Sequence, residues 1–225
     1  MRIGSEPWCE LIAAGAKELG VTIASGQIMQ FARHAELLVS WNRKINLTAI
    51  TDPEQMAVKH YLDVMAALPY VPEDVELLDI GTGGGFPGIP LKIMHPFQPM
   101  TLIDSSRKKI SFVKEVIRSL SLEQVQGIQV RAEELARQTA HRQRYGVVVC
   151  RAVAGLPAIM KLALPLLAPA GRIVAFKGPQ ESPTESSKET AGDLTVEILF
   201  NSMHIDYRLP VSGDPRTLVV MTKCH

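Results

Sequence analysis

Five glycines lie within eight consecutive positions of this chain, at Gly81, Gly83, Gly84, Gly85 and Gly88. A short apolar stretch that ends at Ile80 leads into them, and a second apolar stretch, Gly88–Met94, follows. This order predicts a strand, a tight turn and a helix, and such a turn lets a backbone without Cβ atoms approach a nucleotide-like ligand. The sequence therefore predicts a nucleoside site at the end of this strand.

Two patterns overlap in the glycine turn, and they favour different ligands. Gly83-x-Gly85-x-x-Gly88 satisfies the G-x-G-x-x-G fingerprint of dinucleotide binding. Asp79-x-Gly81-x-Gly83-x-Gly85 instead resembles motif I of the S-adenosylmethionine (SAM) methyltransferases. Pro87 and Pro90 remove two backbone N–H groups from the turn that would face a pyrophosphate. Because SAM carries no phosphate, we favour SAM and keep an NAD-dependent oxidoreductase as the alternative.

An acidic residue ends the next predicted strand. Asp104 lies 23 positions after Gly81, close to the place where an acid binds the two ribose hydroxyls of NAD or of SAM. It could equally cap the helix expected from Arg107, a role that Ser105 could also fill. Asp104 therefore supports a nucleoside ligand without choosing between the two cofactors.

Two further strand ends carry candidate residues. Arg131-Ala132-Glu133 closes the third predicted strand, where the Ala132 N–H could meet an adenine edge. Glu133 could instead be there because a helix N-terminus favours an acid. Arg151 follows the fourth predicted strand and faces the same cleft, either as a ligand contact or as a surface ion-pair partner.

The chain after Pro72 alternates between strands and helices, which predicts a parallel sheet with helices on both faces. In such a sheet the ligand binds at the carboxyl ends of the strands.

The two last predicted strands, Leu194–Phe200 and Thr217–Thr222, have no helix between them and should form an antiparallel hairpin at one edge. A mobile polar loop is expected at Gln180–Asp193. The other predicted strands are Glu76–Ile80, Met100–Asp104, Gly127–Arg131, Tyr145–Cys150 and Arg172–Lys177. The predicted helices are Gly88–Met94, Arg107–Leu120, Glu133–Thr139 and Leu156–Leu167.

Residues 1–70 are predicted to form a helical extension ahead of the larger domain, residues 71–225. Ser5 should cap a first helix that runs to Gly20. The second helix should begin at Ser25 and place Ile45 on its apolar face. Asp52 is the expected N-cap of the third helix, with Pro53 at its first position.

Composition excludes several classes of protein. The 225 residues are 46% hydrophobic and 21% charged with a net charge of +1, which is typical of a globular protein. Between Ser105 and Arg151 ten Lys or Arg face four Glu, and this excess fits either a solvated helix face or a nucleic-acid surface. Three scattered cysteines predict neither a disulfide framework nor a zinc site. The sequence shows no secretory signal or membrane span, so we expect a soluble cytoplasmic protein without a metal.

Six sequence blocks resemble those of the RsmG (GidB) family. Trp41-Asn42-x-x-x-Asn46-Leu47-Thr48 is similar to the family's W-N-x-x-x-N-L-T signature. The glycine motif matches over a longer stretch, from Asp79 to Leu91. The remaining blocks follow in the family's order: Thr101–Ser105, Arg151-Ala152, Lys177-Gly178 and Arg216–Val220. His60-x-x-Asp63 also fits, although Val64 stands where the family usually has Ser.

The resemblance implies a fold, a reaction and a partner. The fold would be a Rossmann-like α/β SAM-dependent methyltransferase fold, a seven-stranded mostly parallel sheet with a C-terminal antiparallel hairpin and an N-terminal helical extension. The reaction would be methylation of N7 of guanine 527 in the 530 loop of bacterial 16S ribosomal RNA, either free or within the small ribosomal subunit. By matching positions, the SAM pocket would be lined by Gly81, Phe86, Ala132, Glu133 and Arg151. On the residue pattern alone, Asp79, Gly83, Gly85 and Asp104 belong to the same cofactor pocket.

Guanine N7 carries a lone pair and no proton, so the expected mechanism needs no general base and consists of positioning. The candidate catalytic residues are Arg151, Lys177 and Arg216, as contacts to guanine O6 or to phosphate. Lys108, Lys109, Lys114 and Arg118 are candidates for RNA backbone contacts. Trp41 could stack on a base or belong to the core. The rivals to this function are the NAD-dependent oxidoreductase and a non-catalytic RNA-binding protein that retains SAM.

Overall fold

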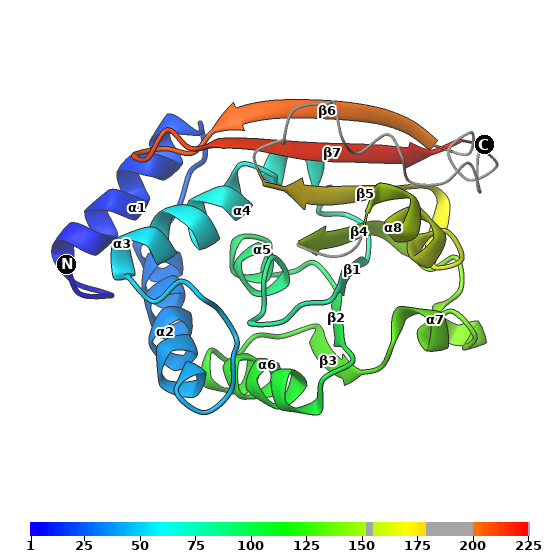
Figure 1. Ribbon diagram of the computed structural model, residues 1–225, viewed down its shortest axis with the longest axis horizontal. Helices are drawn as coiled ribbons and strands as arrows, with labels where there is room; N and C mark the ends of the chain where they lie inside the picture. The colour runs from blue at the N-terminus through cyan, green and yellow to red at the C-terminus, as the bar shows by residue number, and fades with distance from the viewer. Residues whose placement is uncertain (152–154, 179–199, 225) are drawn as a thin grey trace.

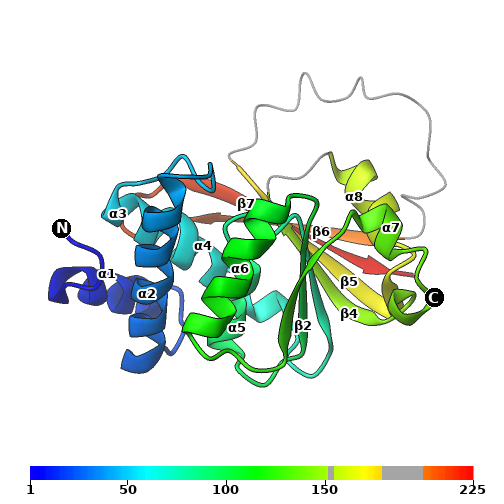
Figure 2. The same cartoon turned by 90° about the horizontal axis from the view of Figure 1, so that it is seen from below.

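The computed structural model of the protein describes residues 1–151, 155–178 and 200–224. In this part of the chain one sheet has the strand order β3-β2-β1-β4-β5-β7-β6 (Figures 1 and 2). The first five strands are parallel, and β7 pairs antiparallel with both β5 and β6. The strands are β1 (Leu77–Ile80), β2 (Met100–Asp104), β3 (Val125–Gln129), β4 (Tyr145–Arg151), β5 (Leu167–Lys177), β6 (Phe200–Arg208) and β7 (Pro215–Lys223). The predicted seven-stranded, mostly parallel sheet with a C-terminal hairpin is confirmed.

Helices cover both faces of the sheet, as its apolar strands require. Every residue of β1 and β2 is buried, which is typical of parallel strands with helices on both sides. One face packs against α5 (Gly88–Met94) and α6 (Arg107–Ser119). The other face packs against α7 (Ala132–Leu135) and α8 (Leu156–Ala163). A short 3-10 turn, η3 (Thr139–His141), follows α7.

The first 70 residues form a helical region at one end of the sheet. Asp52 caps α3 as predicted, because its Oδ1 accepts from the Gln55 N–H at 2.9 Å. Ser5 precedes α1, but its hydroxyl donates to the Arg2 carbonyl instead of capping the helix, so that prediction is wrong. The elements are α1 (Glu6–Glu18), α2 (Ser25–Asn42), α3 (Pro53–Met56), the π-helical turn η1 (Ala57–Leu62), α4 (Asp63–Met65) and the 3-10 turn η2 (Leu68–Tyr70).

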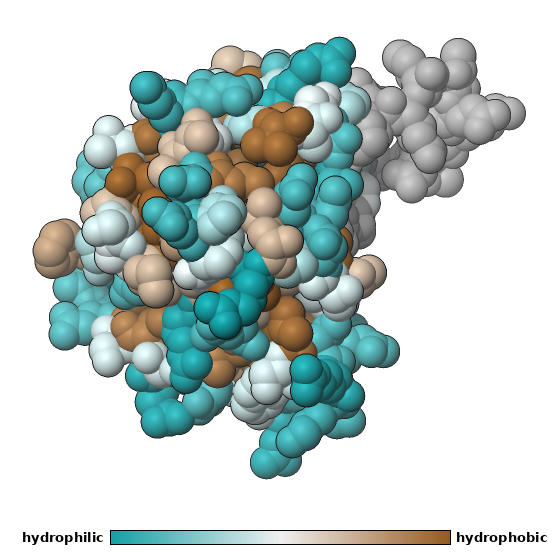
Figure 3. Space-filling model, turned by 90° about the vertical axis from the view of Figure 1, so that its left-hand side faces the viewer, coloured by the Kyte–Doolittle hydropathy of each residue, from teal (hydrophilic) through white to brown (hydrophobic). Residues whose placement is uncertain are grey.

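The helical region shares one hydrophobic cluster with the sheet domain. Trp8, Phe31 and Tyr61 belong to the same buried cluster as Ile89 of α5 and Phe112 of α6. Figure 2 shows α2 beside α6, and the two helices are in contact. The outer face of the helical region mixes hydrophilic and hydrophobic residues (Figure 3). The division at residue 70 stays a prediction, but the two parts pack as neighbours through a common core.

Several predicted boundaries are wrong, and the reasons are local. Helix α2 ends at Asn42, so Ile45 lies beyond it, and α8 ends at Ala163 rather than Leu167. Strand β3 lies two residues earlier than predicted. Strand β6 spans Phe200–Arg208, and residues 201–208 were not predicted as a strand because most of them are polar and none is buried. The predicted strand residues 194–199 and the predicted loop 180–193 lie outside the described residues. None of the described helices is both long and apolar enough to cross a lipid bilayer.

Candidate active site

A cavity of about 340 Å³ opens at the carboxyl ends of β1, β2 and β4, beside the turn between β3 and α7. This is where a parallel sheet of this order presents its ligands. Its apolar walls include Ile80, Ile103, Val130 and Leu162. Of the residues predicted to bind the cofactor, the structure brings five to this cavity: Gly81, Asp104, Ala132, Glu133 and Arg151.

The glycine loop, Gly81–Gly88, connects β1 to α5 and has glycines for two different reasons. Gly83 has a φ of +55°, and a Cβ added there would meet nothing closer than the Gly81 carbonyl oxygen at 3.8 Å. Gly85 has a φ of +84°, and its Cβ would lie 2.7 Å from Ile89 Cγ1. Gly83 thus leaves open space beside the backbone, whereas Gly85 allows close packing inside the core.

Asp104 joins the glycine loop to the start of α6. Its Oδ2 accepts from the Gly83 N–H at 3.1 Å, and its Oδ1 accepts from the Ser106 N–H at 2.8 Å. Lys109 Nζ lies 3.7 Å from Oδ2. Asp104 therefore lines the cavity and holds the residue just before α6, but Ser106 is the N-cap residue and has no side-chain cap bond, so the predicted cap at Asp104 or Ser105 is wrong.

Asp79 lies beneath the glycine loop rather than in the cavity. Its side chain is fully buried, and its Oδ2 accepts from the Gly88 N–H at 3.0 Å. Burial raises the pKa of Asp79 to about 7. Among the described residues, Asp79 Oδ1 and Thr82 Oγ1 are the buried side-chain polar atoms that have no hydrogen-bond partner. Buried polar atoms without a hydrogen-bond partner are uncommon in protein cores.

Phe86 also lies on the side of the loop that faces the helical region. Its ring stacks on His60, with 4.4 Å between ring centroids, and packs against His34 at 4.9 Å. His34 Nε2–H donates to the Gly84 carbonyl at 3.0 Å, so His34 Nδ1 accepts from the Tyr61 hydroxyl at 3.2 Å. Burial lowers the pKa of His34 to about 4, which keeps the ring neutral. This contact could not be predicted from the sequence, because a histidine on an apolar helix face is usually an ordinary core residue.

Arg151 reaches from the end of β4 to the helical region. Its Nη2 lies 3.2 Å from Asp63 Oδ2 and donates to the Lys59 carbonyl. Its Nη1 lies 3.3 Å from His60 Nδ1. Burial and the charge of Arg151 both lower the pKa of His60, to about 3, so this ring is neutral and accepts at Nδ1.

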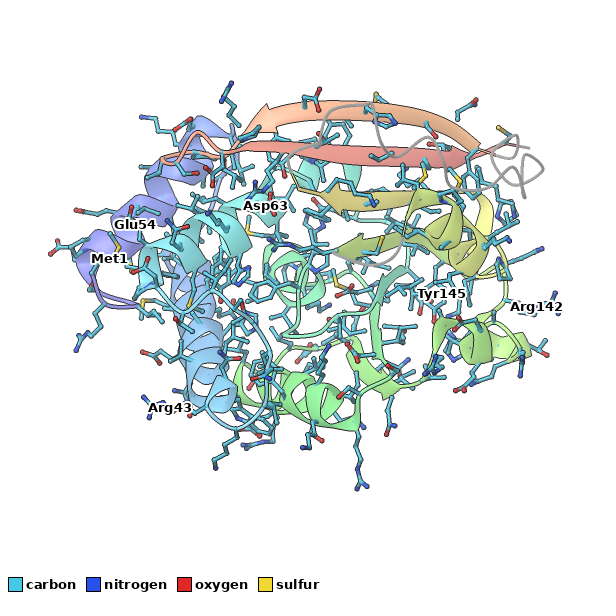
Figure 4. All side chains as sticks on the ribbon, in the orientation of Figure 1. Met1, Arg43, Glu54, Asp63, Arg142 and Tyr145 are labelled. Atoms are coloured by element: carbon cyan, nitrogen blue, oxygen red, sulfur yellow. The ribbon has the colours of Figure 1, made fainter. Side chains whose placement is uncertain are left out.

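Asp63 is the buried centre that brings two predicted catalytic residues together. Arg216 Nε lies 3.9 Å from Asp63 Oδ1, whereas Arg151 approaches Oδ2. The Tyr207 hydroxyl also donates to Oδ1. Burial raises the pKa of Asp63, although the neighbouring cations and the Tyr207 hydroxyl counteract that rise. Figure 4 shows Asp63 on the helical segment below the C-terminal hairpin. The block His60-x-x-Asp63 was the one signal in the sequence that pointed to this residue.

Lys177, the third predicted catalytic residue, lies apart from this centre. It ends β5 and pairs in register with Thr217 of β7. The residue before Lys177, Phe176, pairs across the sheet with Arg151, which lines the cavity. Lys177 therefore lies one strand away from the cavity edge. The neighbouring thiol of Cys150 is buried, which raises its pKa to about 12 and makes it a poor nucleophile.

The basic surface near the cavity lies on α6. Lys108 and Lys114 are exposed, and neither has an ion-pair partner among the described residues. Lys109 turns to Asp104, and Arg118 pairs with Glu115 at 2.7 Å. Of the four lysines and arginines predicted to meet RNA phosphates, two are therefore already engaged. Within the described ranges, no group of three or more His, Cys, Asp or Glu could hold a metal ion.

Comparisons with known proteins agree on one family. Residues 27–204 match the family model described as GidB, rRNA small subunit methyltransferase G. A protein named ribosomal RNA small subunit methyltransferase G from Pelotomaculum thermopropionicum is 41% identical over 218 residues, covering 95% of this chain and 90% of its own. One of the same name from Geobacter sulfurreducens is 40% identical, covering 96% and 98%.

Solved structures resemble this chain in fold at much lower identity. A SAM dependent methyltransferase from Aquifex aeolicus has a TM-score of 0.55 at 13% identity, covering 83% of this chain and 98% of that one. A precorrin-6y C5,15-methyltransferase from Geobacter metallireducens has a TM-score of 0.52 at 15% identity, covering 80% and 92%. At such identities the likeness concerns the arrangement of strands and helices alone.

Proposed function

Since the chain belongs to the rRNA small subunit methyltransferase G (GidB) family, as its motifs predicted, we propose that it transfers a methyl group from SAM to N7 of a guanine in small-subunit ribosomal RNA. The target by resemblance is guanine 527 of the 530 loop in 16S RNA, and the reaction would take place in the bacterial cytoplasm. The observation that carries the proposal is the cavity at the strand ends, which Gly81 and Asp104 line and where Asp104 accepts from the Gly83 N–H.

The residues around the cavity fit SAM. A volume of about 340 Å³ falls within the range of small-molecule sites. Asp104 would bind the ribose hydroxyls, and Ala132 with Glu133 would meet the adenine edge against the apolar walls. Gly81 and Gly83 would leave room for the methionine part. Pro87 and Pro90 take away N–H donors that SAM, unlike NAD, does not use.

The other predicted cofactor residues would support the loop. Asp79 holds the Gly88 N–H from below, Gly85 packs against Ile89, and Phe86 packs against the two histidines. We therefore assign these three a supporting role rather than a direct contact. In the same way residues 1–70 would act as a helical extension that steadies the cofactor loop of residues 71–225.

The chain's own task in this reaction would be to bind and orient two molecules. When bound, SAM supplies an electrophilic methyl group on a sulfonium sulfur. Guanine N7 has no proton to remove, so proximity and alignment provide the acceleration. Arg151 and Arg216, held by Asp63, and Lys177 at the next strand end would contact guanine O6 or a phosphate. Lys108 and Lys114 on α6 would contact the RNA backbone.

The experiment that tests this function is methyl transfer from labelled SAM to small ribosomal subunits, or to free 16S RNA, prepared from cells that lack the protein. The product is then cleaved by chemistry specific for 7-methylguanine. Label at one guanine of the 530 loop supports the proposal, and label at another base or position contradicts it. SAM binding without transfer would favour the non-catalytic RNA-binding protein. Binding of NADH in place of SAM would favour the oxidoreductase.

A further inference from the structure

The helix that follows Asp52 contains the π-helical turn η1, and turns of this type are rare and frequently lie at functional sites. The N–H of Asp63 donates to the carbonyl of Val58, five residues back. In an α-helix that N–H would have bonded to the carbonyl of Lys59. The wider turn therefore frees the Lys59 carbonyl from its usual helical partner.

The freed carbonyl is used by Arg151, which comes from the end of β4, 92 positions further along the chain. Arg151 Nη2 donates to the Lys59 carbonyl and lies 3.2 Å from Asp63 Oδ2. Arg151 Nη1 lies 3.3 Å from His60 Nδ1. One helical turn thus presents three acceptors to a single guanidinium at the edge of the cofactor cavity.

His60 is itself fixed from the opposite side. Its Nε2–H donates to Thr48 Oγ1 at 3.0 Å, which leaves Nδ1 as the acceptor for Arg151. Its ring stacks on Phe86 of the glycine loop at an interplanar angle of 24°. The tautomer and the ring plane of His60 are therefore both determined before any substrate binds.

Asp63 is fixed in the same manner. It is only 2% exposed, and the Tyr207 hydroxyl occupies its Oδ1, which turns Oδ2 toward Arg151. A carboxylate this deeply buried requires cationic and hydrogen-bonding partners to remain charged. Arg151 supplies the nearer cation, at 3.2 Å, and Arg216 the farther one, at 3.9 Å.

We propose that Asp63 and His60 are positioning residues, which together with the Lys59 carbonyl fix the guanidinium of Arg151 at the cavity. His60 affects methyl transfer only through Arg151, whereas Asp63 also holds Arg216. The inference rests on the proposed function, in which Arg151 contacts the substrate. A free arginine side chain has many rotamers, and fixing it in advance removes that entropy from the binding step. The helical extension would in this way contribute to the reaction without touching the substrate.

The kinetic test is a double-mutant cycle on methyl transfer to small ribosomal subunits. Asp63→Asn and His60→Phe should each lower kcat/KM by about 10- to 100-fold, the usual result of misplacing a contact group. His60→Asn, whose Oδ1 replaces Nδ1 as an acceptor, should retain most of the activity. His60→Phe should have no further effect in an Arg151→Ala background, and Asp74→Asn on the exposed surface is the matched control.

Two kinetic results would overturn the proposal. One is full activity in both Asp63→Asn and His60→Phe. The other is a further tenfold loss when His60→Phe is added to Arg151→Ala, which would mean that His60 acts by another route. Because His60→Phe keeps the ring on Phe86, it decides the question should the Asp63 variant fail to fold.

A second measurement separates this inference from the proposed function. In nitrogen-15 arginine NMR, a guanidinium held at both Nη atoms rotates slowly and gives separate Nη signals, and Arg151→Ala identifies them by their loss. We expect the signals to merge in Asp63→Asn and in His60→Phe but not in His60→Asn. Separate signals in all variants would refute the positioning role. Absence of methyl transfer by the wild-type protein would refute the proposed function and leave this result standing.

Discussion

The two sides of the glycine loop differ in what surrounds them. On the cavity side, Gly81, Asp104 and Arg151 line the cavity, and Gly83, whose N–H donates to Asp104, has open space for a Cβ. On the side of the helical region, His34 and Tyr61 are fully buried and are joined by a hydrogen bond. The same run of glycines thus serves ligand approach on one side and close packing on the other. A substitution should therefore affect binding or stability according to the side on which it falls.

The largest effect is expected for Gly85→Ala, on the packed side. The residue has a φ of +84°, and the new Cβ would lie 2.7 Å from Ile89 Cγ1. Backbone strain and overpacking together should lower the free energy of unfolding by about 3 kcal/mol. Chemical denaturation at constant pH measures this loss.

Gly83→Ala is the matched substitution on the cavity side. Its φ of +55° is one that alanine adopts at a cost of about 1 kcal/mol, and no atom is close to its Cβ. We expect this variant to fold well and to bind SAM weakly, as measured by calorimetry, whereas folded Gly85→Ala should bind SAM nearly as wild type does. The reverse pattern would show that the two sides have been assigned the wrong way round.

The next effect concerns Asp104→Asn, which changes the cavity side alone. Asparagine keeps one side-chain oxygen that can accept from the Ser106 N–H, so the chain at the start of α6 should keep its conformation. Loss of the charged acceptor for ribose hydroxyls should weaken SAM binding by about 2 kcal/mol, which is about 30-fold in Kd. Asp52→Asn, at the cap of α3, is the control and should leave SAM affinity unchanged. If Asp104→Asn bound SAM as tightly as wild type does, Asp104 would not be a contact to the ribose.

The sequence could predict the cavity side better than the packed side, for a physical reason. Strand–helix alternation places the ends of β1, β2 and β4 together, so Gly81, Asp104 and Arg151 could be grouped from the order of elements alone. No local pattern tells a glycine that faces a ligand from one that faces a side chain. The residue pattern therefore placed Gly85 in the pocket, and the family resemblance placed Phe86 there, although the structure turns both toward the core.

The contacts of the helical region were harder to foresee, because their partners are far apart in the chain. His34 reaches a carbonyl 50 positions away, and His60 reaches an arginine 91 positions away. The π-helical turn has no sequence signature, so the free Lys59 carbonyl was not predictable. Asp63 matched a family block, but its role depends on Arg151, Tyr207 and Arg216, which only the fold brings to it.

A pH-dependent comparison tests the packed side through His34. Its pKa is about 4 in the folded protein and 6.5 when exposed, so the neutral ring contributes stability above pH 6.5 that is lost as the pH falls toward 4. Against His34→Gln, wild type should lose about 2 kcal/mol between pH 7.5 and pH 5. The pH effects of Asp63 and Asp79 are common to both proteins. His34 influences the pKa of His60 through its charge, but folded His34 is neutral at both pH values. Tyr61 also stays neutral because burial raises its pKa.

The measurement is the free energy of unfolding of both proteins at the two pH values. The difference in free energy of unfolding between wild type and His34→Gln should shrink by about 2 kcal/mol from pH 7.5 to pH 5. His204→Gln, on the exposed side of β6, is the control and should show no such narrowing. A constant gap would mean that His34 is not held neutral between Tyr61 and the Gly84 carbonyl.

The smallest effect is expected beyond the cavity, where α6 meets solvent. Lys114→Ala should weaken RNA binding only a few-fold, and it should reduce the slope of log Kd against log salt by about 1, as expected for one lost phosphate contact. Lys17→Ala, on the exposed face of α1, removes the same charge from the helical region and should leave the slope unchanged. Filter binding of small-subunit RNA across a salt series measures both variants. Equal slopes for the two would mean that the RNA does not distinguish α6 from the helical region, and that the ligand-binding side of the molecule ends at the cavity.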